Sequence, residues 1–277
     1  MLFWGIILLS AAISVAICAG AGGFGSLAWL WMLPAGFVGS YLVLALAAFL
    51  FLVAACRVVD LEKPQEADSR AYRKITRVYV RFLVKFARVR VHTQGLEQLP
   101  SQGRFLLVCN HLNDVDPVLL LDVFADSQLA FVSKQENRDM FVVGKLMHKL
   151  QCQMLNRDDD RQALLVIRKC AEILKEDKAS IAVFPEGYCS TDGLLHHFRS
   201  GVFKIAQKAK VPIVVCTVRN TKAVIPNLRH LRPTDVHLHL VGVLPVSAME
   251  GQTTVAISQQ VHRMMAEDLG PGLTGEE

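Results

Sequence analysis

The amino-terminal part of the chain is an unbroken apolar stretch. From Met1 to Cys56 there is no Asp, Glu, Lys, Arg or His. Residues 2–18 form an apolar run of 17, at the short end for a membrane span, and residues 35–56 form one of 22, which is long enough. Four glycines between Gly20 and Gly25 favour a turn between the two runs. The pattern predicts a hairpin of two membrane helices over residues 1–56, with both ends cytoplasmic.

Details of this hairpin leave alternatives open. Pro34 is expected to open the second helix, because proline is common at the first helical position. Trp29 and Trp31 flank the turn, as interfacial anchors do. A signal peptide is the rival for residues 2–18, but it lacks a basic amino-terminal region and another apolar run follows. A single span in place of two is the second alternative.

Residues 57–92 carry the positive charge of the chain. They hold ten Lys or Arg against four Asp or Glu, whereas residues 93–277 hold twenty against twenty-one. On a helical wheel, one face of residues 70–90 is apolar and the opposite face is basic. The apolar face carries Tyr72, Ile75, Tyr79, Phe82, Leu83 and Phe86, and the basic face carries Arg70, Arg73, Lys74, Arg77, Arg81, Lys85 and Arg88. We expect residues 57–92 to form a basic amphipathic helix in the headgroup plane, with its cations against anionic lipid phosphates. The alternative is a solvated face of a helix packed on the soluble domain.

From residue 91 onward, short apolar runs alternate with stretches of helical periodicity. The runs predict strands over residues 104–109, 129–133, 152–155, 180–184, 211–218 and 236–243. Helices are expected over residues 117–124, 139–149, 159–176, 200–209 and 253–266. This alternation predicts one α/β domain over residues 93–269, with a largely parallel sheet and crossover helices. Residues 270–277 are expected to form a flexible tail.

Composition and charge exclude several classes of protein. The chain is 52% hydrophobic and 20% charged, with a mean hydropathy of +0.33, which excludes disordered and collagen-like proteins. The net charge of +5 is concentrated beside the apolar segment, so a nucleic-acid partner is not expected. Seven cysteines without a Cys-x-x-Cys pair argue against a zinc ribbon or a disulfide framework. No metal or nucleotide motif is present, and no cofactor is expected.

The first candidate site follows the first predicted strand of the domain. Asn110 and His111 come directly after the strand, in a loop that also contains Asp116. A loop at the carboxyl end of a strand is where α/β sheets usually place ligands and catalytic groups. Asp116 before Pro117 equally fits a helix N-cap followed by proline at the first helical position. The residues of this peptide leave a site and a purely structural loop both open.

Two further strand ends carry polar residues. The strand over 180–184 runs into Pro185, Glu186 and Gly187, a sharp turn that presents a carboxylate and backbone N–H groups. Its alternative is an ordinary turn, since proline and glycine are the commonest turn residues. The strand over 152–155 is followed by Arg157. The three aspartates at 158–160 are interpreted as acids of the next helix's first turn, not as a metal site.

The order and spacing of these pieces resemble the 1-acylglycerol-3-phosphate acyltransferase family of membrane glycerolipid acyltransferases. That family is marked by Asn-His-x4-Asp, an apolar strand ending in Arg, Phe-Pro-Glu-Gly and a Val-Pro-Ile strand. Here these motifs fall at residues 110–116, 154–157, 184–187 and 211–213. Residues 133–136 also fit a Ser-Lys-x-Glu stretch that often follows the first motif. The resemblance spans about residues 75–220.

The resemblance implies a reaction and a role for each motif. A fatty acyl group would pass from an acyl thioester, acyl-CoA or acyl-carrier protein, to the hydroxyl of 1-acylglycerol 3-phosphate, forming phosphatidic acid. The attacking hydroxyl needs a general base, for which His111 is suited, with Asp116, or less well Asp114, fixing the imidazole. Arg157 and Lys134 would bind the acceptor's phosphate. The other substrate-binding residues implied are Asn110, Phe184, Pro185, Glu186 and Gly187.

The third motif departs from the family pattern, and rivals from other classes remain. Where the family usually continues Thr-Arg-Ser, this chain has Tyr188, Cys189 and Ser190, so another lysophospholipid acceptor stays open. A lipid hydrolase would use Cys189 or Ser190, although no Gly-x-Ser-x-Gly motif is present. A non-catalytic membrane scaffold is the other rival. The expected location is the cell membrane, with the catalytic domain on the cytoplasmic face.

Overall fold

A seven-stranded mixed sheet forms the centre of the computed structural model, which describes residues 2–64, 69–156 and 159–274. Its strands are β1 (Val89–Gln94), β2 (Leu106–Cys109), β3 (Leu129–Lys134), β4 (Gln153–Leu155), β5 (Ser180–Val183), β6 (Ile213–Arg219) and β7 (Thr234–Leu244). They lie in the order β1-β7-β6-β2-β5-β3-β4. The five strands from β6 to β4 are parallel to one another, β7 is antiparallel to β6, and β1 is parallel to β7. The predicted α/β fold with a largely parallel sheet is confirmed.

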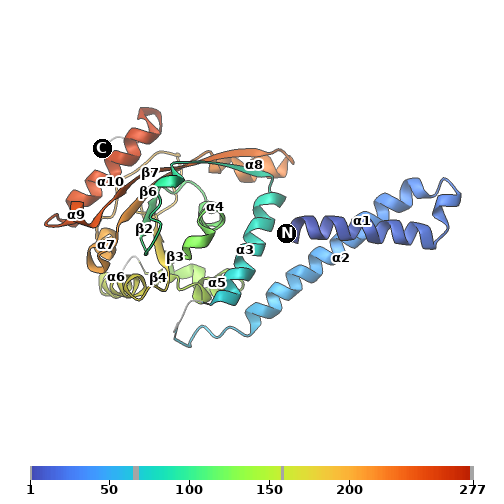
Figure 1. Cartoon of the computed structure of the whole chain (residues 1–277), viewed down its shortest axis with the longest axis horizontal. Coiled ribbons are helices and arrows are strands. Elements are labelled where there is room, and N and C mark those ends of the chain that lie inside the picture. Colours follow the sequence, from blue (N-terminus) through green and yellow to red (C-terminus); the bar gives the residue numbers. More distant parts are fainter. Residues whose placement is uncertain (1, 65–68, 157–158, 275–277) are drawn as a thin grey trace.

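Helices cover both faces of the sheet (Figure 1). They are α4 (Asp116–Val123), α5 (Val143–Lys149), α6 (Asp160–Lys175), α7 (Lys204–Ala209), α8 (Val224–Arg229), α9 (Val246–Met249) and α10 (Thr254–Leu269). Helices α6, α7 and α10 lie on one side of the sheet and α4 on the other. All residues of β2 and β5 are buried, because both faces of these central strands are covered. Their sequences therefore read as unbroken apolar runs.

The sequence pattern does not predict strand β1. β1 covers residues 89–94, most of which the predicted basic helix of residues 57–92 included. It pairs along its whole length with β7, from Val89 opposite Thr234 to Gln94 opposite His239. The sheet therefore begins four residues before the predicted domain start at residue 93. The amphipathic helix itself, α3, is shorter and spans Arg70–Phe86.

The amino-terminal residues form a helical hairpin that points away from the domain (Figure 1). Its helices are α1 (Leu2–Gly20) and α2 (Trp29–Arg57), with mean hydropathies of 2.4 and 2.5, and each is long and apolar enough to cross a membrane. Small polar side chains join them: Ser14 Oγ donates to Leu33 O at 2.5 Å, and Ser40 Oγ donates to Ser10 O at 3.2 Å. Such contacts let two helix backbones approach closely.

The prediction that Pro34 opens the second helix is wrong. α2 begins at Trp29, and Pro34 lies inside it. The first turn forms ahead of the proline, where Met32 N donates to Ala28 O at 3.0 Å. Pro34 lacks an N–H group, so one hydrogen bond of the helix is missing close to its start.

Helix α3 joins the hairpin to the sheet domain through its aromatic face. Tyr72 Oη donates to Ala55 O at 2.7 Å and Tyr79 Oη donates to Ala48 O at 2.5 Å, both in α2. The ring of Phe82 lies 6.0 Å from that of Phe3 in α1. The apolar face of α3 thus packs on the base of the hairpin, and not on the bilayer as the amphipathic pattern predicts.

The basic face of α3 packs on the α/β domain. Arg77 pairs with Asp126 at 2.8 Å and Arg81 pairs with Asp122 at 3.2 Å. Arg73 donates to the backbone carbonyl groups of Leu129 and Leu150. The prediction that this whole face meets lipid phosphate is therefore wrong for these three arginines. An arginine has five donors in a fixed fork, and here protein oxygens occupy some of them.

The carboxyl-terminal residues 270–274, which the sequence assigns to a flexible tail, return to the domain. Leu195 N donates to Leu273 O at 2.8 Å, and Leu195 forms an isolated parallel bridge with Thr274. Because Leu195 lies in the long loop after β5, this contact ties the end of the chain to that loop. Residues 275–277 lie outside the described part of the chain.

Candidate active site

The site lies at the carboxyl edge of the parallel strands, around His111. This residue follows β2, which pairs with β5 on one side and β6 on the other. Its Nδ1 lies 2.9 Å from Asp116 Oδ2. The imidazole is 15% exposed, and among the described residues its Nε2 has no hydrogen-bond partner. The predicted pairing of His111 with Asp116 is present, and it leaves one ring nitrogen available to a ligand.

Asp116 is fully buried and organises the loop that carries His111. Besides the imidazole, its Oδ2 accepts from the backbone N–H groups of Leu112 at 2.7 Å and Asn113 at 2.8 Å. The interpretation of Asp116 as an N-cap is wrong, because it is the first residue of α4 and Val115 stands at the cap. Its carboxylate reaches backward to the loop and does not cap the helix. Asp114, the weaker candidate, is exposed.

Residues that follow strand β5 also contact His111. The ring of Phe184 stacks on that of His111, with centroids 4.1 Å apart and planes 16° apart. Glu186 is 1% exposed, and its Oε1 accepts from the backbone N–H of His111 at 2.9 Å. Its Oε2 accepts from the backbone N–H of His196 at 3.1 Å. Phe184 and Glu186 therefore position His111, and the carboxylate of Glu186 is already occupied by two backbone donors.

Gly187 makes the turn after Glu186 possible. Its φ is 78°, in the left-handed region that favours glycine, and its N–H donates to Phe184 O at 3.0 Å. A Cβ at this position would lie 2.8 Å from Nε of Arg199. Pro185 O accepts from Arg199 N at 2.8 Å. Pro185 and Gly187 therefore both lie against Arg199, in the segment that leads to α7.

Burial raises the pKa of Glu186, while the N–H groups of His111 and His196 act in the opposite direction. The folded state therefore holds the proton of this carboxyl more tightly than the unfolded state does. Ionisation of Glu186 costs stability as the pH rises from the ordinary glutamate pKa, about 4.3, through the raised folded value. The carboxylate is buried despite this cost because the backbone N–H groups of His111 and His196 need an acceptor there.

Glu186→Gln should lower the free energy of unfolding by about 1–3 kcal/mol and reduce activity with it. The amide turns an NH2 donor toward one of two buried backbone donors, which leaves that N–H without an acceptor. Thermal unfolding of the full chain in detergent measures the effect, with Glu97→Gln, an exposed glutamate, as control. Equal unfolding temperatures for the two variants would contradict this role for Glu186.

The loop after Gly187 contains a hydrogen-bonded group, Ser190, Asp192 and His196, of which the sequence analysis singled out only Ser190, as a conceivable nucleophile. Ser190 N donates to His111 O at 2.8 Å, which links the two loops through their backbones. Ser190 Oγ and His196 Nε2 both contact Asp192 Oδ1, at 2.8 and 2.9 Å. The N–H of Leu194 and these two side chains hold the pKa of Asp192 well below its usual range. The signal available in the sequence was the pair of histidines shortly after Asp192 and Gly193.

The other predicted site residues are placed differently. Asn110 pairs both polar atoms of its side chain with the backbone of Val218, at 3.0 and 2.7 Å, so it joins the ends of β2 and β6. Lys134 ends β3 at the same edge of the sheet as His111, with its side chain exposed and without a polar partner in the described part of the chain. Arg157 and Asp158 lie outside the described residues. Asp159 caps α6 and accepts from Arg161 N and Gln162 N.

Neither conceivable nucleophile of the third motif is set up for attack. Burial raises the pKa of the Cys189 thiol, and the carboxylates of Asp116 and Asp114 raise it further. Ser190 is 1% exposed, and its hydroxyl donates to Asp192 and accepts from Gly193 N. A hydrolase needs an effective base beside its nucleophile, and the Asp192 carboxylate that accepts from Ser190 is a weak base because its pKa is held low.

The chain is similar in sequence to known acyltransferases. The family model described as Acyltransferase matches residues 90–219. A 1-acyl-sn-glycerol-3-phosphate acyltransferase, BAT2, chloroplastic, of Brassica napus is 36% identical over 134 residues, which are 48% of this chain and 38% of that protein. The human 1-acyl-sn-glycerol-3-phosphate acyltransferase beta is 23% identical over 68% of this chain and 67% of its own.

The fold recurs in a solved structure. The crystal structure of the 1-acyl-sn-glycerophosphate (LPA) acyltransferase PlsC from Thermotoga maritima superposes with a TM-score of 0.57. The superposition covers 82% of this chain and 89% of that one, at 23% identity. The coverage of this chain exceeds the 48% matched by the Brassica protein, so the structural similarity extends well beyond that matched sequence segment.

Proposed function

We propose that this chain, whose residues 90–219 belong to the acyltransferase family, transfers a fatty acyl group to 1-acylglycerol 3-phosphate and forms phosphatidic acid. The observation that carries the proposal is the pairing of His111 with the buried Asp116 at the carboxyl edge of the sheet. The matched relatives named for this reaction support it, although this chain covers only 38% of the Brassica protein. The donor is an acyl thioester, either acyl-CoA or acyl-carrier protein.

The reaction needs a base and no protein nucleophile. His111 Nε2 takes the proton of the acceptor hydroxyl while the oxygen attacks the thioester carbonyl carbon. The tetrahedral intermediate collapses, the carbon–sulfur bond breaks, and the imidazolium returns the proton to the thiolate. The carboxylate of Asp116 stabilises the imidazolium and holds the ring in the tautomer that leaves Nε2 free.

The acceptor's phosphate binds at the same edge of the sheet. Lys134 ends β3, and Leu155, opposite Lys134 in the register of β3 and β4, precedes Arg157 by two residues. A point charge and a planar guanidinium together suit a phosphate monoester. Another lysophospholipid is the second candidate acceptor, because Cys189 occupies the position at which the third motif usually has arginine.

The apolar hairpin supports a location of this chemistry at a bilayer. Many side chains of α1 and α2 are exposed and apolar, including Leu8 at 68% and Leu42 at 62%. Burying them in lipid removes that surface from water. The proposed location is the cell membrane with the α/β domain on its cytoplasmic face, where a lysolipid reaches the site without leaving the bilayer.

The test is acyl transfer by membranes that contain the wild-type chain. A labelled acyl thioester is offered with lysophosphatidate, with lysophosphatidylcholine, and without acceptor. We expect labelled phosphatidate in the first reaction only. Label in phosphatidylcholine alone would establish the second candidate, free fatty acid would indicate a hydrolase, and no product from either acyl-CoA or acyl-carrier protein would indicate a scaffold.

A further inference from the structure

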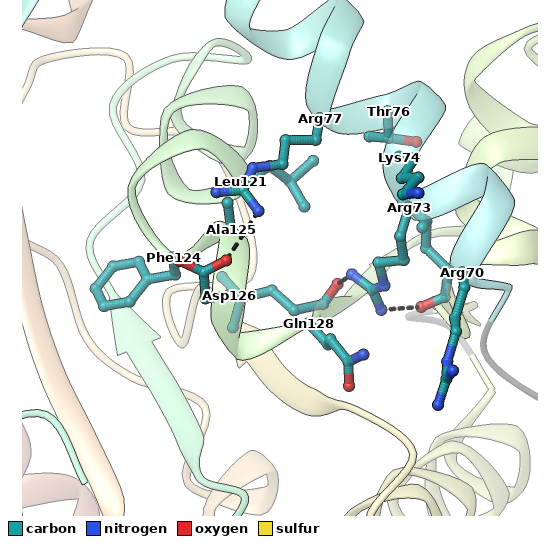
Figure 2. A pocket seen from close by; sticks show the side chains of 12 residues that line it. Arg70, Arg73, Lys74, Thr76, Arg77, Leu121, Phe124, Ala125, Asp126 and Gln128 are labelled. Carbon is teal, nitrogen blue, oxygen red and sulfur yellow. Dashed lines mark hydrogen bonds and ion pairs between the residues drawn. The ribbon is translucent and has the colours of Figure 1, made fainter. Parts of the chain in front are cut away.

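A basic cavity of about 300 Å³ lies between α3 and the segment that connects α4 to β3 (Figure 2). Four basic side chains of α3, spaced along one helix face, line one wall, and Asp126 is the acidic residue on the opposite wall. These four are Arg70, Arg73, Lys74 and Arg77. The remaining wall includes the half-buried Leu121, Ala125 and Gln128, while Phe124, Leu129 and Leu150 are buried behind it.

The charge of this cavity is only partly compensated. Arg77 pairs with Asp126 at 2.8 Å, and Arg73 reaches the carbonyl groups of Leu129 and Leu150, as the dashed lines in Figure 2 show. Within residues 2–64, 69–156 and 159–274, Arg70 and Lys74 have no hydrogen bond or ion pair. Figure 2 shows the side chain of Arg70 extending away from Arg73 at the end of α3. Two cations at one end of the cavity are thus available to an anion.

The cavity is separate from the candidate active site. Leu129, in its wall, begins β3 and pairs with Ser180 at the start of β5, whereas His111 lies beyond the end of β2. Helix α4 lies between the two, because its first residue, Asp116, contacts His111 and Leu121, near its end, lines the cavity. Its eight residues span about 12 Å. A ligand in this cavity is therefore not the acyl acceptor in its reacting position.

The cavity lies on the side of α3 that faces the α/β domain, and α3 itself packs on the base of the hairpin. The face of α3 opposite to Arg70 and Lys74 contacts α2 through Tyr72 and Tyr79. With the hairpin in a bilayer, α3 lies at the level of the headgroups, where an anionic lipid presents phosphate to nearby cations. The half-buried Leu121 and Ala125 offer apolar contacts to the glycerol of such a lipid, which a free phosphate lacks.

We propose that this cavity binds the phosphate headgroup of an anionic bilayer lipid, through Arg70 and Lys74, as a site distinct from the acceptor site. The proposal rests on the bilayer insertion of the hairpin stated under the proposed function, and not on the acyl-transfer reaction. A lipid held here fixes the tilt of the domain on the membrane, because α3 contacts both the hairpin and the sheet domain.

Native mass spectrometry of the full chain in detergent tests the site. The probes are phosphatidylglycerol, which is neither acceptor nor product of the proposed reaction, phosphatidylcholine with the same acyl chains, and inorganic phosphate. We expect Arg70→Gln with Lys74→Gln to weaken phosphatidylglycerol binding about tenfold or more, since each cation near a headgroup contributes to affinity. The matched control is Lys85→Gln with Arg90→Gln, which removes two exposed cations outside the cavity and should leave binding unchanged.

Three outcomes would overturn the proposal: equal binding by the two double variants, equal binding of phosphatidylglycerol and phosphatidylcholine to the wild type, or inorganic phosphate binding as tightly as the lipid. The last result would identify a free phosphate as the ligand. Because the readout is binding, loss of the site in the Arg70 and Lys74 variant supports the proposal even if the wild type transfers no acyl group. Conversely, active enzyme with unselective lipid binding would contradict this inference alone.

Discussion

Replacement of His111 by alanine is expected to lower kcat for acyl transfer by about 10²- to 10⁴-fold, the contribution typical of a positioned general base. The change removes the group that accepts the hydroxyl proton, while Asp116 keeps its bonds to Leu112 N and Asn113 N. The loop should therefore keep its shape and the protein should stay folded in the membrane. Initial rates with a labelled acyl thioester and lysophosphatidate, at equal amounts of protein, measure the loss.

The matched control is His230→Ala, which removes an exposed histidine at the end of α8. This variant should retain wild-type turnover and the same unfolding temperature. If the two alanine variants turn over equally fast, another group takes the proton and the assignment of His111 is wrong.

Asp116→Asn should lower kcat by about 10²- to 10⁴-fold, with a much smaller effect on KM. Asp116 is fully buried beside His111, so its charge acts on the imidazolium at short range and with little screening by water. Asparagine keeps the size of the side chain but not the charge, and it orients the imidazole through a neutral group. Steady-state kinetics with lysophosphatidate as the varied substrate separate kcat from KM.

Asp114→Asn is the comparison that distinguishes the two aspartates of this loop. Asp114 is exposed and has no hydrogen bond among the described residues, so its substitution should change kcat little. An equal loss in the two variants would mean that general negative charge near His111 matters, and not the hydrogen bond that Asp116 Oδ2 accepts from the imidazole.

Much of the fold was predictable because strands that are buried on both faces have continuous apolar sequences. The central strands β2 and β5 are covered on both faces, and their apolar runs locate them to within about two residues. The edge strand β1 has no such sequence, since its burial is only partial and its partner β7 comes about 140 residues later. Its two inward valines, Val89 and Val91, follow directly after a basic helix, so the sequence pattern assigns them to that helix.

The site was predictable in part for a similar reason. The carboxyl ends of neighbouring parallel strands meet at one edge, so a histidine after β2 and a glutamate after β5 had to lie close together. What each side chain does there was not predictable. Glu186 and Asn110 use their polar atoms on the backbones of His111, His196 and Val218, and these partners come from distant parts of the chain.

The sequence by itself determined the apolar hairpin, the amphipathic helix, the α/β alternation and the chemistry available at the strand ends, because hydrophobic spacing and residue type are local properties. Only the tertiary structure decided that Asp116 serves His111 and does not cap α4, and that the aromatic face of α3 meets α2. The same packing leaves Arg70 and Lys74 facing an open cavity while Arg73, Arg77 and Arg81 contact the domain. The physical reason is that a side chain's partner depends on which distant segment packs against it, and the pattern along one helix or loop does not contain that information.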